Sequence, residues 1–176
     1  MHDAGDVTAF TEFCGARADA LFRTAYLMVG DHQLAQDLLQ EALVKTLLAW
    51  PRLSDRGNLE AYTRRVIVTT SISWRRRRSF HERPQEPLPE LSGPDAAEAV
   101  VTHGALVAAL RTVPPRQRAA IVLRYYQDLT EQQTADAMGC SVGAVKSQVS
   151  AGLRRLRETL GPAFDHSVTA DQEVRS

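Results

Sequence analysis

Residues 129–146 read LTEQQTADAMGCSVGAVK, a stretch with the stop and start signals of two short helices joined by a tight turn. Thr130 is placed to cap the first helix, because its hydroxyl can accept a backbone N–H of the first turn. Gly139 can end that helix in the left-handed conformation that glycine tolerates. Ser141 can cap the second helix, and Ala135 is small where the two helices must approach closely. The stretch therefore predicts a helix-turn-helix.

The second of these helices, which we expect to run to about residue 160, has two unlike sides. Apolar residues recur at helical spacing and predict a buried stripe: Val145, Val149, Leu153, Leu156 and Leu160. The opposite side is small and polar: Gly143, Lys146, Ser147, Ser150, Ala151 and Arg154. Such a side suits the major groove of duplex DNA, where basic and hydroxyl side chains contact phosphates and base edges. An ordinary helical hairpin with no role on DNA is the alternative interpretation.

The rest of the chain also has helical rather than alternating periodicity, so the sequence predicts an all-α fold. Helices are expected over residues 7–29, 33–50, 59–78, 98–112 and 116–126. Proline and glycine between the third and fourth of these exclude a regular helix or strand: Pro84, Pro87, Pro89, Gly93 and Pro94. We therefore predict two small helical domains at 7–79 and 98–162, a flexible acidic linker at 80–97 and a disordered tail at 163–176.

Charge alternates in sign along the chain, although the formal net charge is zero. Residues 51–83 hold nine basic and three acidic residues, and residues 111–164 hold eight basic and four acidic residues. Two basic blocks favour two sites for a polyanion such as nucleic acid. Solvated surface is the simpler alternative for each block.

Several function classes lack support in the sequence. There is no stretch of about eighteen apolar residues, so we expect no membrane insertion. Cys14 and Cys140 lie far apart in apolar patterns, which favours structural thiols in a cytoplasmic protein. The sequence has no phosphate-binding glycine loop, no clustered His/Cys set and no motif that pairs a nucleophile with a base. We therefore expect no enzymatic activity, no catalytic residue, no metal and no cofactor.

The helix expected over 59–78 is basic and aromatic. Its last four residues are consecutive arginines, which surround a helix and cannot all serve one face. Some of them are expected to follow phosphates with a salt-dependent affinity. Trp74 is either a core residue, the commoner role at a helix position, or a surface on which an unpaired base stacks.

The helix expected over 33–50 has a polar face opposite its leucine stripe. Asp37, Glu41 and Lys45 recur at four-residue intervals, with Gln40 beside them. Spacing alone favours a solvated face that a Glu41–Lys45 ion pair supports. A docking face for a basic partner is the alternative.

Together these segments resemble the extracytoplasmic-function group of bacterial RNA polymerase sigma factors, over roughly residues 10–162. The resemblance lies in three blocks: Asp37–Glu41 with Leu47–Trp50, then Asn58–Arg78, then Leu110–Leu160. It implies a non-enzymatic subunit that binds the polymerase core and directs it to promoter DNA. An anti-sigma factor is a further candidate partner.

The resemblance also implies a role for each block. The first would dock on the clamp coiled coil of the polymerase's largest subunit, through Asp37, Gln40 and Glu41. The second would melt the minus-ten element and hold a flipped base, through Arg56, Gly57, Asn58, Arg64, Arg65, Thr69, Trp74, Arg75 and Arg76. The third would read the minus-thirty-five element, through Arg124, Gly143, Lys146, Ser147, Ser150 and Arg154.

Two positions depart from the family pattern, because Thr69 stands where asparagine is common and Ala151 where arginine is common. The contacts at both positions, and hence the promoter preference, stay open. A stand-alone helix-turn-helix regulator is the alternative function, and it would leave the docking helix and the arginine helix without a role. An RNA-binding adaptor would explain the arginines but not the helix-turn-helix.

Overall fold

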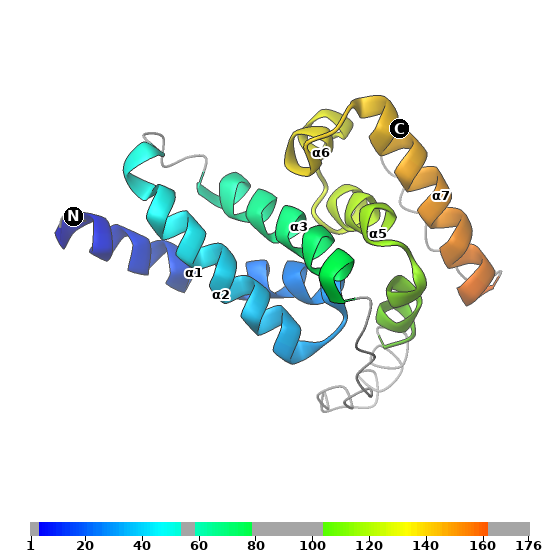
Figure 1. The fold of residues 1–176 in the computed structure, drawn as a ribbon, viewed down its shortest axis with the longest axis horizontal. Helices are drawn as coiled ribbons and strands as arrows, with labels where there is room; N and C mark the ends of the chain where they lie inside the picture. The colour runs from blue at the N-terminus through cyan, green and yellow to red at the C-terminus, as the bar shows by residue number, and fades with distance from the viewer. Residues whose placement is uncertain (1–3, 54–58, 79–103, 162–176) are drawn as a thin grey trace.

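The computed structural model describes residues 4–53, 59–78 and 104–161, and all regular structure within these ranges is helical. The all-α prediction is thereby confirmed. The first part holds α1 (Ala4–Val29), α2 (His32–Ala49), the short 3₁₀ helix η1 (Trp50–Arg52) and α3 (Leu59–Arg78). The second part holds a helix at 104–112, α5 (Pro115–Ile121), the π-helix η3 (Val122–Tyr126), α6 (Glu131–Met138) and α7 (Val142–Leu160) (Figure 1). The predicted linker and tail lie outside the described residues.

The helix ends follow the capping residues that the sequence contains. Oδ1 of Asp31 accepts the backbone N–H of Leu34 at 2.8 Å and begins α2. Thr130 and Gln133 form a reciprocal capping box at the start of α6, Gly139 ends that helix at φ +63°, and the Ser141 hydroxyl accepts from Ala144 N–H to begin α7. These caps confirm the predicted helix-turn-helix boundaries. The main difference is that α1 begins at Ala4, three residues before the predicted start.

Helices α1, α2 and α3 pack into a three-helix unit because each turns an apolar stripe inward. Ala25, Leu38 and Ile67 have no accessible surface and mark its centre. Trp50 closes one end, with its ring centroid 5.4 Å from Phe10 and 6.4 Å from Phe13 in edge-on contacts. The three helices therefore form a rigid base for the surface residues of α2 and α3.

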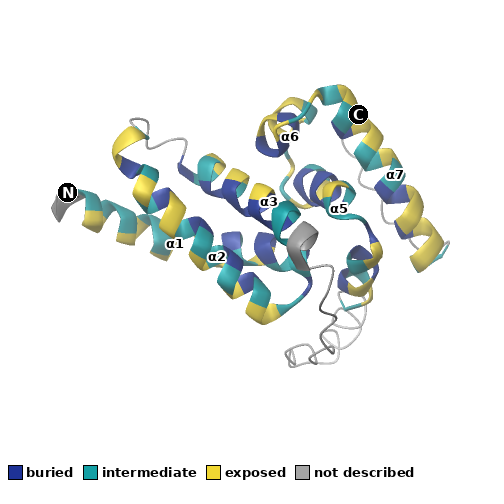
Figure 2. Ribbon diagram, in the orientation of Figure 1, coloured by how far each residue is buried: buried dark blue, intermediate teal, exposed yellow. Residues whose placement is uncertain are grey.

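Helix α3 also contacts the second module, so it lies between the pair α1–α2 and the pair α5–α6 (Figure 1). Buried residues continue from one module into the other and form one core cluster (Figure 2). The sequence predicted two modules but gave no sign that they would pack together, because helical periodicity shows that a face is apolar without showing which element covers it.

Among the described residues, Arg118 on α5 is the largest whose side chain is fully buried. Its Nη1 donates to the carbonyl of Met28 at 2.8 Å, and its Nη2 donates to the carbonyls of Arg111 at 2.8 Å and Val113 at 3.1 Å. Met28 lies in the last turn of α1, where helical carbonyls lack partners within the helix. One guanidinium therefore satisfies acceptors in both modules and holds the end of α1 against α5.

A second contact between the modules depends on a glycine. Gly30 has a φ of +70°, and a Cβ at this position would lie 2.5 Å from Cγ of Arg111. Because glycine has no Cβ, the Arg111 side chain can lie directly over the turn. Its Nη1 is 3.4 Å from the Gly30 carbonyl oxygen. Burial raises the pKa of Tyr26 nearby, while the charge of Arg111 acts in the opposite direction.

The third contact comes from the end of η3. A π-helix is wound more widely than an α-helix, with hydrogen bonds between residues five apart. At the end of η3, the N–H of Gln127 accordingly donates to the carbonyl of Val122 at 3.0 Å. The Gln127 side chain then accepts from Arg64 Nε at 3.1 Å and donates to Thr24 Oγ1 at 2.9 Å. Gln127 thus joins two helices of the first module to the second module.

Replacing Arg118 with methionine is expected to lower the free energy of unfolding by about 3 kcal/mol, because three carbonyl groups lose their donor, in two buried bonds and one part-buried bond. Urea denaturation followed by circular dichroism measures this change. The matched control is Arg116→Met on the same helix, where the side chain is exposed. Equal unfolding midpoints for the two variants would show that the buried guanidinium does not make the expected contribution to stability.

Candidate nucleic-acid interface

The two sides of α7 lie as predicted. Val145, Leu153 and Leu156 are buried against the helices of the second module. The predicted contact residues on the other side are exposed: Gly143, Lys146, Ser147, Ser150 and Arg154. Since the N-terminal part of the second helix of such a motif approaches base edges, this exposed face has the position that major-groove contact needs.

A hollow of about 350 Å³ lies beside this face, where η3, α6 and α7 meet. Three of the predicted DNA contacts line it: Arg124, Lys146 and Ser150. Arg124 also donates to the carbonyl of Leu129, which fixes the guanidinium at the start of the helix-turn-helix. Among the predicted residues on α7, Gly143, Ser147 and Arg154 do not line the hollow and belong to the neighbouring stripe of the exposed face.

Sequence reasoning missed two charged residues of the hollow, Glu131 and Arg157. Nζ of Lys146 lies 3.4 Å from Oε2 of Glu131, so a carboxylate neutralises part of the local positive charge. Arg157 lies eleven residues after Lys146, three turns along the same side of α7, and this spacing was the signal that could have identified it.

The predicted minus-ten residues of α3 have unlike surroundings. Arg65 and Thr69 are exposed, whereas the side chain of Arg64 is only 14% accessible. Arg64 donates to Glu60 at 2.8 Å, in addition to its bond to Gln127 of the second module. Arg75 and Arg76 lie in α3, but their side chains are outside the described part of the chain. Arg56, Gly57 and Asn58 also lie outside it.

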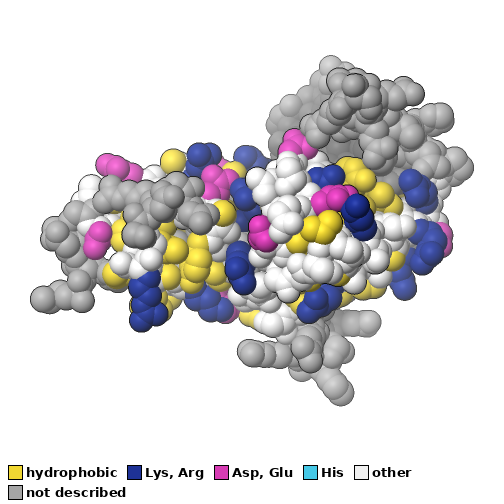
Figure 3. Space-filling model, turned by 90° about the horizontal axis from the view of Figure 1, so that it is seen from above, with side chains coloured by type: hydrophobic (Ala, Val, Ile, Leu, Met, Phe, Trp, Pro, Cys, Tyr) yellow, Lys and Arg dark blue, Asp and Glu magenta, His cyan; other side chains and the backbone are white. Residues whose placement is uncertain are grey.

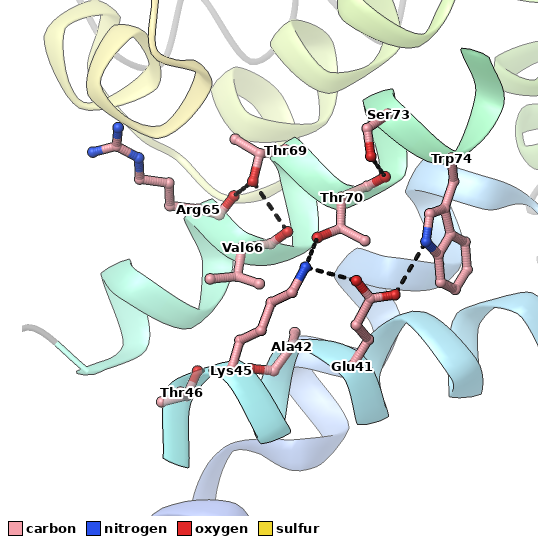
Figure 4. Close-up of polar contacts among 10 residues, drawn as sticks. All are labelled: Glu41, Ala42, Lys45, Thr46, Arg65, Val66, Thr69, Thr70, Ser73 and Trp74. Atoms are coloured by element: carbon pink, nitrogen blue, oxygen red, sulfur yellow. Dashed lines mark hydrogen bonds and ion pairs between the residues drawn. The ribbon is translucent and has the colours of Figure 1, made fainter. Parts of the chain in front are cut away.

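Trp74, the fourth described residue of this set, faces α2. Its indole is half-buried against the core of the first module, and Nε1 donates to Oε2 of Glu41 at 3.1 Å (Figure 4). Oε1 of Glu41 accepts from Lys45 Nζ at 2.6 Å, so the predicted Glu41–Lys45 pair is confirmed. The structure thereby joins a predicted docking residue to a predicted DNA contact.

The remaining docking residues lie on the outer face of α2. Gln40 is exposed, and Asp37 is half-buried with Oδ1 3.3 Å from Nε2 of Gln33. Val44 and Leu48 on the same helix are 56% and 69% exposed, and sequence reasoning missed them as surface residues. Their four-residue spacing from Gln40 was a usable signal, because it places two apolar side chains outside the buried stripe.

On the face seen in Figure 3, basic side chains are spread over both modules with acidic side chains among them. Within residues 4–53, 59–78 and 104–161, no three His, Cys, Asp or Glu side chains form a group able to hold a metal ion. No helix in these ranges has the length and hydropathy of a membrane span. Burial raises the pKa of the Cys14 thiol, and both cysteines are half-buried and unpaired by disulfide.

Each of the two modules matches a known protein family. Residues 15–81 match Sigma-70 region 2, and residues 103–156 match Sigma-70, region 4. Two relatives named RNA polymerase sigma-E factor, from Streptomyces avermitilis and Streptomyces coelicolor, are each 41% identical over 156 residues. These alignments cover 89% of this chain and 87% and 88% of the relatives.

The ECF RNA polymerase sigma factor SigL of Mycobacterium tuberculosis is 30% identical over 151 residues, covering 81% of this chain and 84% of SigL. Among solved structures, the fold is similar to that of the sigma factor RpoE of Bartonella quintana, which was crystallised with the anti-sigma factor NepR. The TM-score is 0.70 at 24% identity, over 88% of this chain and 98% of the other.

Replacing Gly143 with leucine is expected to weaken duplex binding about tenfold while leaving stability unchanged or slightly higher. A Cβ at Gly143 meets only Ser141 Oγ at 3.9 Å, so the fold has room for it, and leucine is the better helix former. The added side chain would occupy the groove-facing surface. Gly15→Leu is the matched control, because that helical glycine is also exposed with open space around it. Fluorescence anisotropy with promoter duplex measures binding. Equal affinities for the two variants would show that this face of α7 does not contact the duplex.

Proposed function

The chain belongs to the extracytoplasmic-function group of bacterial RNA polymerase sigma factors, which direct transcription initiation, and we propose how its surfaces divide that task. Residues 7–79 form the module that docks on the polymerase core and opens the minus-ten element. Residues 98–162 form the module that reads the minus-thirty-five element, with a linker at 80–97 and a tail at 163–176. A stand-alone regulator is not favoured, because the family matches include both modules.

The observation that best supports this assignment of the two modules is the exposed polar face of α7, which lies beside the hollow lined by Arg124, Lys146 and Arg157. In the proposed complex, Gly143, Ser147 and Arg154 approach the major groove, and the hollow takes a backbone phosphate. Three cationic side chains around one hollow suit a phosphate better than a base edge. Lys146 exchanges the carboxylate of Glu131 for this phosphate when DNA binds.

In the first module, Arg65 and Thr69 offer an exposed strip of α3 to the backbone of the minus-ten element. Arg64 joins them after its bonds to Glu60 and Gln127 are replaced by phosphate contacts. Arg56, Gly57, Asn58, Arg75 and Arg76 stay proposed contacts on the family resemblance. The site adds binding energy to strand opening and needs no catalytic group or cofactor.

Docking on the core uses the outer face of α2. Asp37 and Gln40 supply polar contacts, and we add Val44 and Leu48 as apolar anchors, because exposed apolar side chains on a helix commonly bury in a partner's surface. The polymerase places the protein's action in the cytoplasm. An anti-sigma factor is a candidate partner, since the Bartonella protein of similar fold was crystallised with one.

Run-off transcription with bacterial core polymerase tests the docking face. Asp37→Arg and Leu48→Glu are each expected to reduce specific transcripts at least about tenfold, because a hot-spot anchor is typically worth about 2 kcal/mol or more and each 1.4 kcal/mol is about a factor of ten. Both side chains lie away from the buried core, so circular dichroism should show a folded chain. Asp19→Arg is the control, since it makes the same charge reversal on an exposed position of α1. Full transcription by both docking variants would overturn the assignment of this face.

The phosphate exchange predicts opposite effects of two substitutions in the hollow. Lys146→Ala is expected to lower duplex affinity and reduce the slope of log affinity against log salt by about 1, the value for one lost phosphate contact. Glu131→Gln is expected to raise the affinity, since Lys146 no longer has an acidic competitor 3.4 Å away. Anisotropy titrations at several salt concentrations measure both. An unchanged slope for Lys146→Ala would show that Lys146 contacts no phosphate.

A further inference from the structure

Glu41 lies at a junction between the two proposed surfaces of the first module. The family resemblance places it with Asp37 and Gln40 on the docking face of α2. Its carboxylate, however, is directed to α3, where Oε2 accepts from Trp74 Nε1 at 3.1 Å (Figure 4). Its other oxygen, Oε1, accepts from Lys45 Nζ at 2.6 Å. Both oxygens are therefore already hydrogen-bonded in this state, one to Trp74 and one to Lys45.

Lys45 extends the network to α3 a second time, because Nζ lies 3.3 Å from Oγ1 of Thr70 (Figure 4). Glu41 and Lys45 are one turn apart on α2, and Thr70 and Trp74 are one turn apart on α3. The contacts pair them in opposite chain order, as two antiparallel helices require. This polar seam therefore fixes the rotation and position of the Trp74 end of α3 against α2.

The seam is accessible enough to be exchanged. The side chains of Lys45 and Glu41 are 46% and 36% exposed, so a basic group bound on α2 can reach the carboxylate from solvent. Deeper along the same helix pair, the Thr46 and Thr63 hydroxyls are 3.0 Å apart and fully buried. The buried pair holds the helices together, while the exposed pair can change partners without separating them.

Trp74 in this state lies half-buried against the core, so only part of its indole is accessible to DNA. Stacking on an unpaired base requires an accessible indole face. The bond from Nε1 to a carboxylate is of the stronger, charge-assisted kind and favours the held position.

We propose that Glu41 is a positioning residue that couples docking on α2 to the availability of Trp74 for an unpaired base. A basic docking partner draws the Glu41 carboxylate outward, the bond to Trp74 Nε1 breaks, and the indole leaves the seam. The partner shifts the population toward the released state by the difference in its affinity for the two states. This inference rests on the proposed function, since it takes α2 as the docking helix and α3 as the base-binding helix.

The experiment follows Trp74 directly in the full-length chain. Trp50→Phe leaves Trp74 as the sole tryptophan, because the sequence has two. Incorporation of 5-hydroxytryptophan allows excitation at wavelengths where the tryptophans of core polymerase do not absorb. If Trp50→Phe does not fold, the spectrum of the labelled wild-type chain minus that of labelled Trp74→Phe gives the same signal.

Three measurements are made on each variant: association with core polymerase, Trp74 emission with and without core, and affinity for a single-stranded oligonucleotide. The oligonucleotide is the non-template minus-ten strand of a promoter that the chain transcribes in the run-off assay. In the wild type, we expect core alone, without DNA, to shift the Trp74 emission to longer wavelength as the indole becomes solvated.

In the free chain, Glu41→Ala is expected to show this shifted emission already. Its affinity for the oligonucleotide without core should rise by about fivefold, since apparent affinity scales with the fraction of chain in the competent state. Glu41→Gln retains an amide oxygen that can accept from Trp74, so its free emission should stay near that of the wild type. The variant Asp37→Asn is the matched control: it removes a charge from the same face of α2 but contacts Gln33 of its own helix. It should weaken docking without changing the emission of the free chain.

The outcomes separate the coupling from the function on which it rests. Core binding with no change in Trp74 emission would overturn the coupling and leave the docking proposal intact. Wild-type emission in the free Glu41→Ala chain would show that Glu41 does not position the indole. Absence of any association with core would instead contradict the proposed docking function itself.

Discussion

The guanidinium of Arg118 connects three backbone carbonyls, one from the first module and two from the second, in the interior of the protein. Burial of a charged group is costly unless its donors are satisfied. Here the acceptors include a carbonyl at the C-terminal end of α1, where the helix itself supplies no donor. The position of the second module therefore depends on where α1 ends, and the turn at Gly30 fixes that end.

This contact explains why α3 is covered on two sides. Its apolar stripe packs on α1 and α2, and its next face meets α5 and α6. Arg64 lies at that boundary and bonds to Gln127 of the second module. A phosphate that reaches Arg64 must therefore replace a contact between modules. In this closed arrangement, the proposed DNA binding by α3 and the packing between the modules compete for the same side chain.

The surfaces of the first module also share residues. Docking by α2 and base binding by α3 were assigned to separate blocks of sequence, yet Glu41 and Trp74 bond to each other across the helix pair. Antiparallel packing brings residues 33 positions apart into contact. If α2 docks and α3 binds the base as proposed, two surfaces that share a carboxylate cannot respond independently, and this bond is the proposed route from core association to promoter opening.

The sequence by itself determined the elements and the composition of their faces. Helical periodicity predicted α2, α3 and α7, and Thr130, Gly139 and Ser141 predicted the boundaries of the helix-turn-helix, because caps and left-handed turns depend on local backbone chemistry. Contacts between distant residues were decided only by the tertiary structure. Arg118 was indistinguishable in sequence from the exposed Arg116, Gln127 was not singled out, and the bond from Trp74 to the predicted docking residue Glu41 was not foreseen. Their partners are fixed by how the helices pack, and packing depends on the shapes of many side chains at once, which periodicity does not encode.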